Sequence, residues 1–217
     1  MAKTNLEITS YPNGIYGATT YLVSDKISKE AFLVDCTCDI EEIEKQVKKE
    51  NLTLKYALIT HGHFDHVFCI DKLKEKFPQT QILMNKEDMP LLKNVGTQCT
   101  MAGIEGIKIP CVDGLIKEDT KNLKIGDYKI DIIETPGHSQ GGTCYLINDK
   151  ENNFLFSGDT LFQESVGRCD LFGGDFKKIL SSIKEKLFSL DENTIVFPGH
   201  GDSTTIAHEK KYNSYCR

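Results

Sequence analysis

Three features that would assign the chain to a broad class of protein are missing. No apolar run reaches the roughly 18–20 residues that a membrane-spanning helix needs, so we expect no membrane span. Acidic residues outnumber basic ones, 32 to 26, which gives a net charge of -6. Because nucleic-acid binding requires a basic surface, this balance argues against DNA or RNA as a partner. The N-terminal residues MAKTNLEITS contain no apolar signal-peptide core, so we expect a cytoplasmic protein.

The cysteines also lack the spacing of a known disulfide or zinc motif. There are eight, but only Cys36 and Cys38 lie close together, and a single residue separates them. Zinc knuckles and thioredoxin-like motifs use a gap of two residues. Because a reducing cytoplasm disfavours disulfides, we expect all eight to be thiols that only pack within the fold.

Hydrophobic periodicity predicts strands and helices along the whole length. Strands are expected over residues 6–12, 18–24, 31–34, 54–60, 81–84, 129–134, 144–147, 154–157 and 194–197. Helices are expected over residues 40–50 with Asp39 as the cap, 66–77, 176–188 and a short C-terminal segment, whereas residues 86–120 predict one helix and a long loop. No linker or change of composition divides the chain, so we expect a single domain over residues 1–217. Two strand-rich halves with outer helices predict an α/β fold, an αββα sandwich of two mixed β-sheets.

One arrangement recurs four times, in which an apolar strand is followed directly by a polar cluster that contains glycine. The four junctions read LIT-HGHFDH, IIE-TPGHS, LFS-GDT and VF-PGHG. Sites are usually built where strands end at one rim of a layered fold. The four clusters are therefore candidates for one shared site.

The first cluster is rich in histidine. The chain has only six histidines, and three of them, His61, His63 and His66, lie within six positions of the stretch THGHFDHVFCI, together with Asp65. An extended backbone places His61 and His63 on the same side, and Gly62 between them allows a tight turn. The alternative interpretation of Asp65 is the N-cap of the next helix.

Imidazole and carboxylate groups are the ligands that zinc, iron and manganese take. One loop cannot surround a metal, so further ligands are expected from the other strand ends, where His138, Asp159 and His200 lie. Five of the six histidines are then used. His208, in the expected C-terminal helix, is interpreted as an ordinary surface histidine.

The four polar clusters together resemble the motifs of a known family. HGHFDH resembles the HxHxDH signature of the metallo-β-lactamase fold superfamily, and TPGHS, SGDT and PGHG follow in that family's order and spacing, so the match covers nearly the whole chain. The stretches LFQESVGRCDLFGGD and GHGDSTTIAHEKKYN look like those of short, single-domain relatives of glyoxalase II (hydroxyacylglutathione hydrolase) and of the related persulfide dioxygenases. The resemblance implies the metallo-β-lactamase fold.

The resemblance also implies a site for two divalent metal ions, with Zn²⁺ expected first and Fe or Mn as alternatives. Carried over position by position, one metal is held by His61, His63 and His138, the other by Asp65, His66 and His200, and Asp159 bridges the two. Asp65 and Asp159, the expected catalytic carboxylates, offset part of the charge of the two cations. The remaining charge favours a bridging hydroxide near neutral pH.

The reaction that this implies is hydrolysis of a small-molecule thioester by a metal-dependent hydrolase of the glyoxalase II type. A thiol has a pKa of roughly 8.5, so a thiolate leaves without a general acid, whereas an amide nitrogen would need protonation. Only 17 residues follow His200, where full-length glyoxalase II has a C-terminal helical domain that helps to bind glutathione. The thiol carrier and the oligomeric state therefore stay open.

The segment Gly167-Arg168-Cys169-Asp170 departs from the short relatives at one position. They commonly have Thr or Ser where this chain has Cys169, which is either a neutral replacement or a thiol exposed to oxidation near the metals. Arg168 and Asp170 match the group, in which they look like residues that anchor substrate or support the ligands. The alternative for these two is a surface ion pair.

Three other functions compete with thioester hydrolysis. A persulfide dioxygenase resembles this chain in fold and motifs but uses one iron, held by the residues that match His61, His138 and Asp159. A nuclease of the superfamily usually inserts a second domain, for which no segment is present here. A non-catalytic metal-binding protein is disfavoured because every ligand position is filled.

Overall fold

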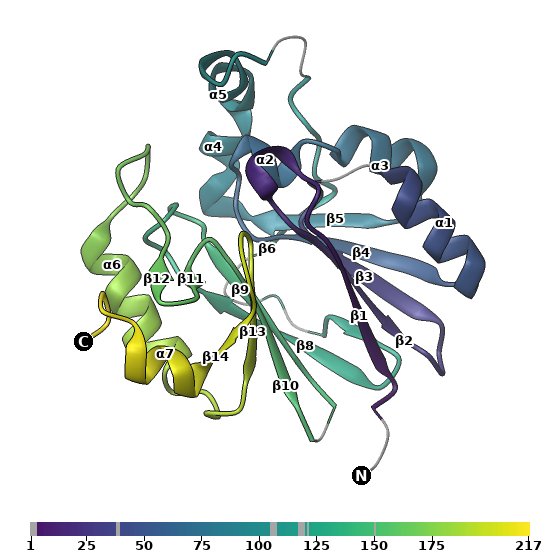
Figure 1. Ribbon diagram of the computed structural model, residues 1–217. Helices are drawn as coiled ribbons and strands as arrows, with labels where there is room; N and C mark the ends of the chain where they lie inside the picture. Colours follow the sequence, from purple (N-terminus) through teal and green to yellow (C-terminus); the bar gives the residue numbers. More distant parts are fainter. Residues whose placement is uncertain (1–3, 38–39, 105–107, 117–119, 121, 150) are drawn as a thin grey trace. The chain divides into compact units, whose positions relative to one another are not determined.

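The computed structural model describes residues 4–37, 40–104, 108–116, 120, 122–149 and 151–217, so Cys38 and the expected cap Asp39 lie outside the described part. The chain falls into two compact units, Met1–Thr120 and Lys121–Arg217, and each contains a six-stranded sheet (Figure 1). The single domain expected over residues 1–217 stays a prediction.

The sheet of the first unit is mixed, in the order β1-β2-β3-β4-β5-β6. β1, β2 and β3 are antiparallel neighbours, whereas β3, β4, β5 and β6 run parallel. Five of the strands were predicted, and β6 was not. Their bounds are β1 Leu6–Tyr11, β2 Thr20–Asp25, β3 Glu30–Val34, β4 Thr53–Ile59, β5 Gln81–Asn85 and β6 Gly114–Ile116.

Helices α1 and α3 cover one face of this sheet, as Figure 1 shows. α1 spans Ile40–Glu50, as predicted, and buries Ile40, Ile43 and Val47 in a core cluster with alternate residues of β2, β3, β4 and β5. Complete burial of such an apolar side chain contributes roughly 1.5–3 kcal/mol. The remaining short helices are η1 Ile15–Gly17, α2 Phe64–Val67, α3 Ile70–Lys76, η2 Lys86–Asp88, α4 Met89–Lys93 and α5 Val95–Met101.

The helix expected over residues 66–77 is divided into α2 and α3. Its break coincides with two backbone bonds to the segment after β3, since Cys36 N–H donates to His66 O at 2.9 Å and Cys69 N–H donates to Cys36 O at 3.0 Å. The amide of Cys69 is therefore used between segments and not within one continuous helix. These bonds fix His66 against the end of β3.

The sheet of the second unit is also mixed, in the order β14-β13-β10-β9-β8-β7. β10 and β13 are parallel, and the other neighbours are antiparallel. A separate hairpin, β11–β12, follows β10. The bounds are β7 Lys124–Ile125, β8 Tyr128–Glu134, β9 Thr143–Asn148, β10 Asn153–Gly158, β11 Leu161–Phe162, β12 Ser165–Val166, β13 Ile195–Pro198 and β14 Thr204–Thr205.

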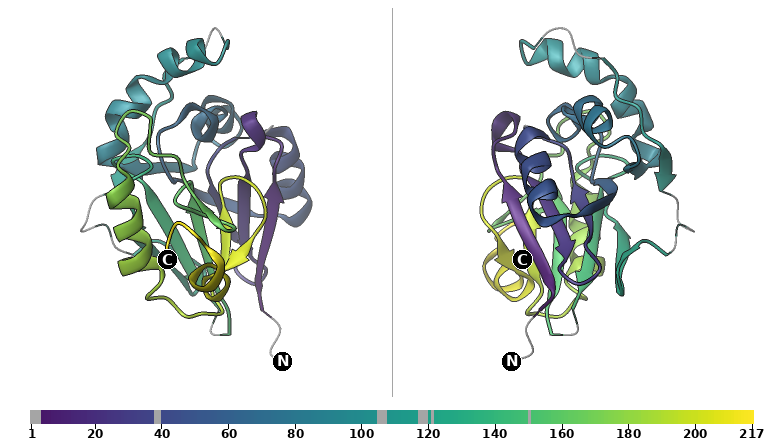
Figure 2. Two further views of the ribbon diagram at one scale, coloured as in Figure 1. Left: turned by 60° about the vertical axis from the view of Figure 1, so that its left-hand side comes forward. Right: turned by 90° about the vertical axis from the view of Figure 1, so that its right-hand side faces the viewer.

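The helix predicted over residues 176–188 is present in two parts. It begins as α6 (Phe176–Ser181) and continues as the π-helical segment η3 (Ser182–Leu187) (Figure 2). Ile179, Ile183 and Leu187 are buried in a cluster with β9, β10 and β13. Phe176, the first residue of α6, is 49% exposed. The short C-terminal helix is α7, Ile206–Tyr212, which also joins this cluster.

The direction of the strands gathers the polar clusters at one edge of each sheet. β3 and β4 are parallel neighbours, so Asp35 and the segment that begins at Thr60 leave the first sheet at the same edge. In the second sheet β8, β10 and β13 point the same way, because β8 and β10 are each antiparallel to β9. His138, Asp159 and His200 therefore follow strand ends at one edge of that sheet.

The structure bears on two of the predictions, the absence of a membrane span and the absence of disulfides. No helix in the described ranges is long and apolar enough to cross a lipid bilayer. Seven of the eight cysteines fall within those ranges, and none of the seven belongs to a disulfide there. The cytoplasmic location stays a prediction.

Gly137, which precedes His138, packs closely against helix α6. Its φ is 144°, and a Cβ added there would lie 2.2 Å from Ile179 N in α6. We predict that Gly137→Ala lowers the free energy of unfolding by roughly 1–3 kcal/mol or more, through overpacking and backbone strain. Urea denaturation of the purified chain measures this change.

Gly96→Ala is the matched control for this substitution. Gly96 lies inside α5, and a Cβ there meets nothing within 4 Å. Because alanine is the better helix former, this change should raise the free energy of unfolding by about 0.5–1 kcal/mol. Equal effects of the two substitutions would contradict the steric account of Gly137.

Candidate metal centre

The segment after β4 buries four of the side chains predicted as ligands. His61, His63, Asp65 and His66 are 2%, 7%, 8% and 0% exposed. The rings of His61 and His63 lie 4.8 Å apart between centroids, and those of His61 and His66 lie 4.0 Å apart. The N-cap residue of α2 is His63, and Asp65 lies in the first helical turn. Asp65 is therefore not the cap, which was the alternative interpretation.

Two of these imidazoles have their protonation fixed by Asp35. The Asp35 carboxylate accepts from His66 Nδ1 at 2.8 Å and from the Thr60 hydroxyl at 2.9 Å. Since the Thr60 hydroxyl donates its proton to Asp35, it accepts from His61 Nδ1 at 2.9 Å. Both rings thus hold their proton on Nδ1 and carry the lone pair on Nε2. This is the arrangement that supports metal-binding histidines in proteins.

Asp35 was not predicted from the sequence. It is 1% exposed, and it also accepts from the backbone amide of Thr60 at 2.8 Å. Its φ of 59° is in the left-handed region, which a non-glycine residue occupies at a cost and which is common near functional sites. One signal was present, because Asp35 directly follows the apolar strand 31–34, as the recognised clusters follow their strands.

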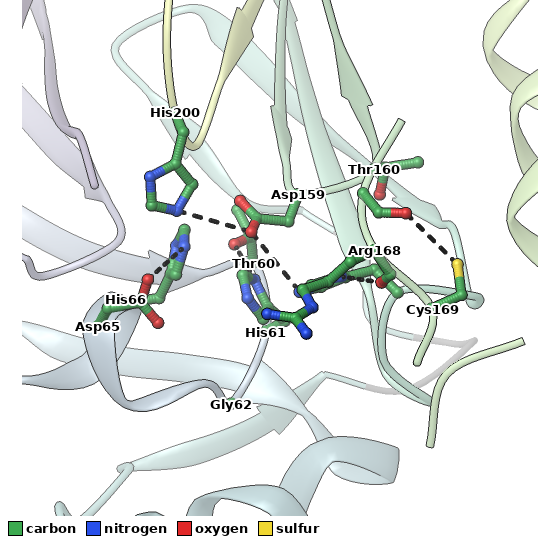
Figure 3. A network of polar contacts seen from close by, with 12 residues as sticks. Thr60, His61, Gly62, Asp65, His66, Asp159, Thr160, Arg168, Cys169 and His200 are labelled. Carbon is green, nitrogen blue, oxygen red and sulfur yellow. Dashed lines mark hydrogen bonds and ion pairs between the residues drawn. The ribbon is translucent and has the colours of Figure 1, made fainter. Parts of the chain in front are cut away.

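The second unit brings its three predicted ligands together around one carboxylate oxygen. Oδ2 of Asp159 lies 3.6 Å from Nε2 of His138 and 3.6 Å from Nε2 of His200. Figure 3 shows the His200 ring directed at Asp159, and Asp65 beside His66 in the first unit. His138 Nδ1 donates to the backbone carbonyl of Arg168 at 2.7 Å, so the lone pair of this ring is also on Nε2.

The spacing of these donor atoms suits a cation better than a direct hydrogen bond. A separation of 3.6 Å is too long for a hydrogen bond. Two ligands of one tetrahedral zinc ion, each about 2.1 Å from it, lie about 3.4 Å apart. In the first unit, His66 Nε2 and Asp65 Oδ2 are 3.8 Å apart. Donor type, tautomer and spacing therefore fit divalent metal ions in both units.

Gly167 was not predicted as a part of the site, yet the second unit requires glycine there. A Cβ at this position would lie 1.8 Å from Asp159 O and 3.2 Å from His138 Nδ1. The segment after β12 can therefore approach both ligands only without a side chain. This approach brings the Arg168 carbonyl to His138.

The side chains of Arg168 and Asp170 form a bidentate ion pair with distances of 2.7 and 2.8 Å. Both are exposed, and the hydrogen bonds from Arg168 lower the pKa of Asp170 to about 2. The two side chains thus form an ion pair at the surface, and their role in anchoring substrate or supporting the ligands stays a prediction. The Cys169 thiol donates to Gly167 O at 3.4 Å, and burial raises its pKa (Figure 3). His208 on α7 pairs with Glu164 at 3.0 Å and is partly exposed.

The chain resembles known proteins in both sequence and structure. The family model described as the metallo-beta-lactamase superfamily matches residues 14–200. The chain is similar to the probable metallo-hydrolase YqgX of Bacillus subtilis, with 34% identity over 94% of each chain. It is also similar to the hydroxyacylglutathione hydrolase GloC of Haemophilus influenzae, with 32% identity over 86% of this chain and 87% of that protein.

Two crystal structures resemble the whole chain. The BLEG-1 B3 metallo-beta-lactamase has a TM-score of 0.86 and 33% identity, over 97% of this chain and 99% of that one. TTHA1623 in a di-iron-bound form has a TM-score of 0.79 and 29% identity, over 95% of this chain and 99% of that one. These neighbours and the two mixed sheets confirm the predicted fold class.

The role of Asp35 can be tested without any metal. Asp35→Ala leaves the buried donors of Thr60 and His66 without this acceptor and places alanine at a φ of 59°. Each lost buried bond costs about 1–3 kcal/mol, so we predict a loss of several kcal/mol of unfolding free energy. Asp35→Asn, which keeps an acceptor and tolerates this backbone, should lose less. Denaturation of chelator-treated protein measures both, and a wild-type value for Asp35→Ala would contradict the network.

Proposed function

The chain belongs to the metallo-beta-lactamase superfamily, and on this premise we propose that it is a metal-dependent thioester hydrolase of the glyoxalase II type. The proposal is carried by the three imidazoles whose protons are held on Nδ1 by Asp35, Thr60 and the Arg168 carbonyl. Each of these rings therefore keeps the lone pair of Nε2 for a metal ion. Two relatives support hydrolysis, since one is named as a probable metallo-hydrolase and the other as a hydroxyacylglutathione hydrolase.

We propose that the seven residues predicted as ligands bind two divalent ions. One ion would be held by His61, His63 and His138, the other by Asp65, His66 and His200, with Asp159 shared. The shared role rests on Asp159 Oδ2, which lies equally far from His138 and His200. Zinc suits this mixture of imidazole and carboxylate ligands. Iron is the alternative, because the similar TTHA1623 was crystallised in a di-iron-bound form.

The bound metals would supply a nucleophilic hydroxide at neutral pH and polarise the acyl carbonyl. The residues of the chain would balance the charge of the metals, orient the ligands and contact the substrate. Asp65 and Asp159 add two negative charges that offset the repulsion between cations, and the Asp35 carboxylate makes His61 and His66 stronger donors. The Arg168 carbonyl orients His138, which leaves the exposed guanidinium of Arg168 beside the site, where we propose that it and Asp170 contact the substrate.

A thioester is favoured over an amide because of its leaving group. A thiolate departs without protonation near neutral pH, whereas an amide nitrogen needs an acid. The similarity to the BLEG-1 B3 metallo-beta-lactamase makes hydrolysis of a β-lactam the second candidate, since its cyclic amide is strained. The two activities can be measured on one preparation.

The test combines metal analysis with three substrates. We expect two divalent metals per chain, hydrolysis of S-lactoylglutathione that a chelator abolishes, and little turnover of a chromogenic cephalosporin. Rapid cephalosporin hydrolysis without thioesterase activity would replace the proposal with a β-lactamase. One iron per chain, with oxygen uptake and sulfite production from glutathione persulfide, would replace it with the persulfide dioxygenase.

Asp159 should matter more than any other single ligand. Asp159→Ala removes a ligand from both proposed metals and one negative charge between them, whereas His66→Ala and His200→Ala each weaken only the second metal. Loss of even an indirect partner of a metal typically costs about 10–100-fold in affinity or activity, so we predict a larger loss for Asp159→Ala. The readouts are metal content and thioester turnover of the three variants. Two metals and near-normal turnover in Asp159→Ala would disprove the shared role.

A further inference from the structure

The segment from η2 to α5 contributes two side chains that bond to the ligand loop. The backbone amide of Gly62 donates to Asp88 Oδ2 at 2.9 Å, and the amide of Phe64 donates to Gln98 Oε1 at 3.1 Å. Gly62 lies between His61 and His63, and Phe64 lies between His63 and Asp65. The two bonded amides therefore alternate with three of the proposed ligands. The sequence predicted one helix and a long loop over residues 86–120, and it assigned no role to Asp88 or Gln98.

The side chain of Asp88 is buried where it contacts the ligand loop. It is 1% exposed and is the N-cap residue of α4, a position at which aspartate normally accepts from its own helix. Here its side chain makes no such cap bond and instead accepts from Gly62. A carboxylate that accepts from a backbone amide makes a stronger bond than a neutral acceptor. The helical segment itself begins at η2, where the side chain of Asn85 accepts from Glu87 N, so the Asp88 carboxylate is available to the ligand loop.

Gln98 links three helices through both ends of its amide. Its Nε2 donates to Leu91 O in α4 at 2.9 Å, while its Oε1 accepts from Phe64 N at the start of α2. The donor at one end fixes which atom faces Phe64. Gln98 lies in α5, so its two hydrogen bonds connect α4 and α5 to the backbone amide between His63 and Asp65.

Gly62 allows helix α4 to lie close to the ligand loop. It was expected to allow a tight turn, but it is not among the glycines with positive φ. A Cβ there would instead lie 3.0 Å from Asp88 O and 3.1 Å from Leu92 N. A side chain at this position would push the backbone of α4 away by a few tenths of an ångström, so glycine favours the close packing of α4 against the ligand loop.

We propose that Asp88 and Gln98 are positioning residues that set the spacing of His61, His63 and Asp65 for metal binding. Neither is a ligand, and each acts through a backbone amide next to ligands. Bonds on both sides of His63 restrict the backbone that carries its imidazole, so the donors are held in place before a metal arrives. The inference rests on the proposed function, because it assumes that these three side chains bind metal.

The test compares metal affinity and ligand geometry in full-length variants. Asp88→Ala and Gln98→Ala should each weaken zinc binding, measured by competition with a chromophoric chelator, by about 10–100-fold. They should also change the visible absorption spectrum of the Co²⁺-substituted protein, which reports coordination geometry. Asp88→Asn keeps an oxygen acceptor for Gly62 N and should restore affinity to within a few-fold of wild type. Asp71→Ala and Gln79→Ala, both at exposed positions, are the matched controls and should match wild type.

Unfolding of the metal-stripped variants separates positioning from a general loss of stability. Wild-type affinity and an unchanged Co²⁺ spectrum in both alanine variants would overturn the inference, as would a loss that Asp88→Asn fails to rescue. If Asp88→Ala does not fold, Gln98→Ala, at a partly exposed position, decides the matter alone. Wild-type protein that binds no metal would instead refute the proposed function, which is a distinguishable result.

Discussion

The bond between the buried Asp35 carboxylate and His66 is the interaction on which the rest of the site depends. An imidazole can hold its proton on either nitrogen, and only a nitrogen without a proton can bind a cation. Asp35 fixes this choice for His66 directly and for His61 through the Thr60 hydroxyl. The second unit meets the same requirement with a neutral acceptor, the Arg168 carbonyl, which orients His138. The charged Asp35 carboxylate therefore orients His66 and, through Thr60, His61, whereas the neutral Arg168 carbonyl orients His138.

Close packing, rather than local turns, brings these partners within bonding distance. Gly62 lets α4 reach the ligand loop, Gly167 lets the segment after β12 reach Asp159 and His138, and Gly137 lets α6 reach the end of β8. Each contact joins a ligand segment to an element distant in sequence. The ligands are consequently held by the cores of their units, and substitutions far from any ligand should alter metal binding. The Asp88 carboxylate is the clearest case, because it accepts from Gly62, 26 residues away in the sequence.

The sequence was informative wherever a pattern was long enough to be periodic. The strands of five or more residues and helix α1 were predicted, and so were the polar clusters at strand ends. β7, β11, β12 and β14 have two residues each, which is too short for any periodicity, and β6 has three. Asp35, Asp88 and Gln98 escaped notice for another reason. Their partners in the ligand segment lie between 25 and 34 residues away, so these contacts form only in the folded chain.

The hydrogen bonds of His61, His66 and His138 leave Nε2 of each ring available to a metal ion. Long-range ¹H–¹⁵N correlation spectra of the histidine side chains test it directly, because they distinguish protonated from unprotonated ring nitrogens. We predict that all three rings carry their proton on Nδ1 in metal-stripped protein at neutral pH, and that added zinc shifts their Nε2 resonances while the Nδ1 protons remain. Spectra in which these rings are protonated on Nε2, or in which zinc leaves Nε2 unchanged, would contradict the account.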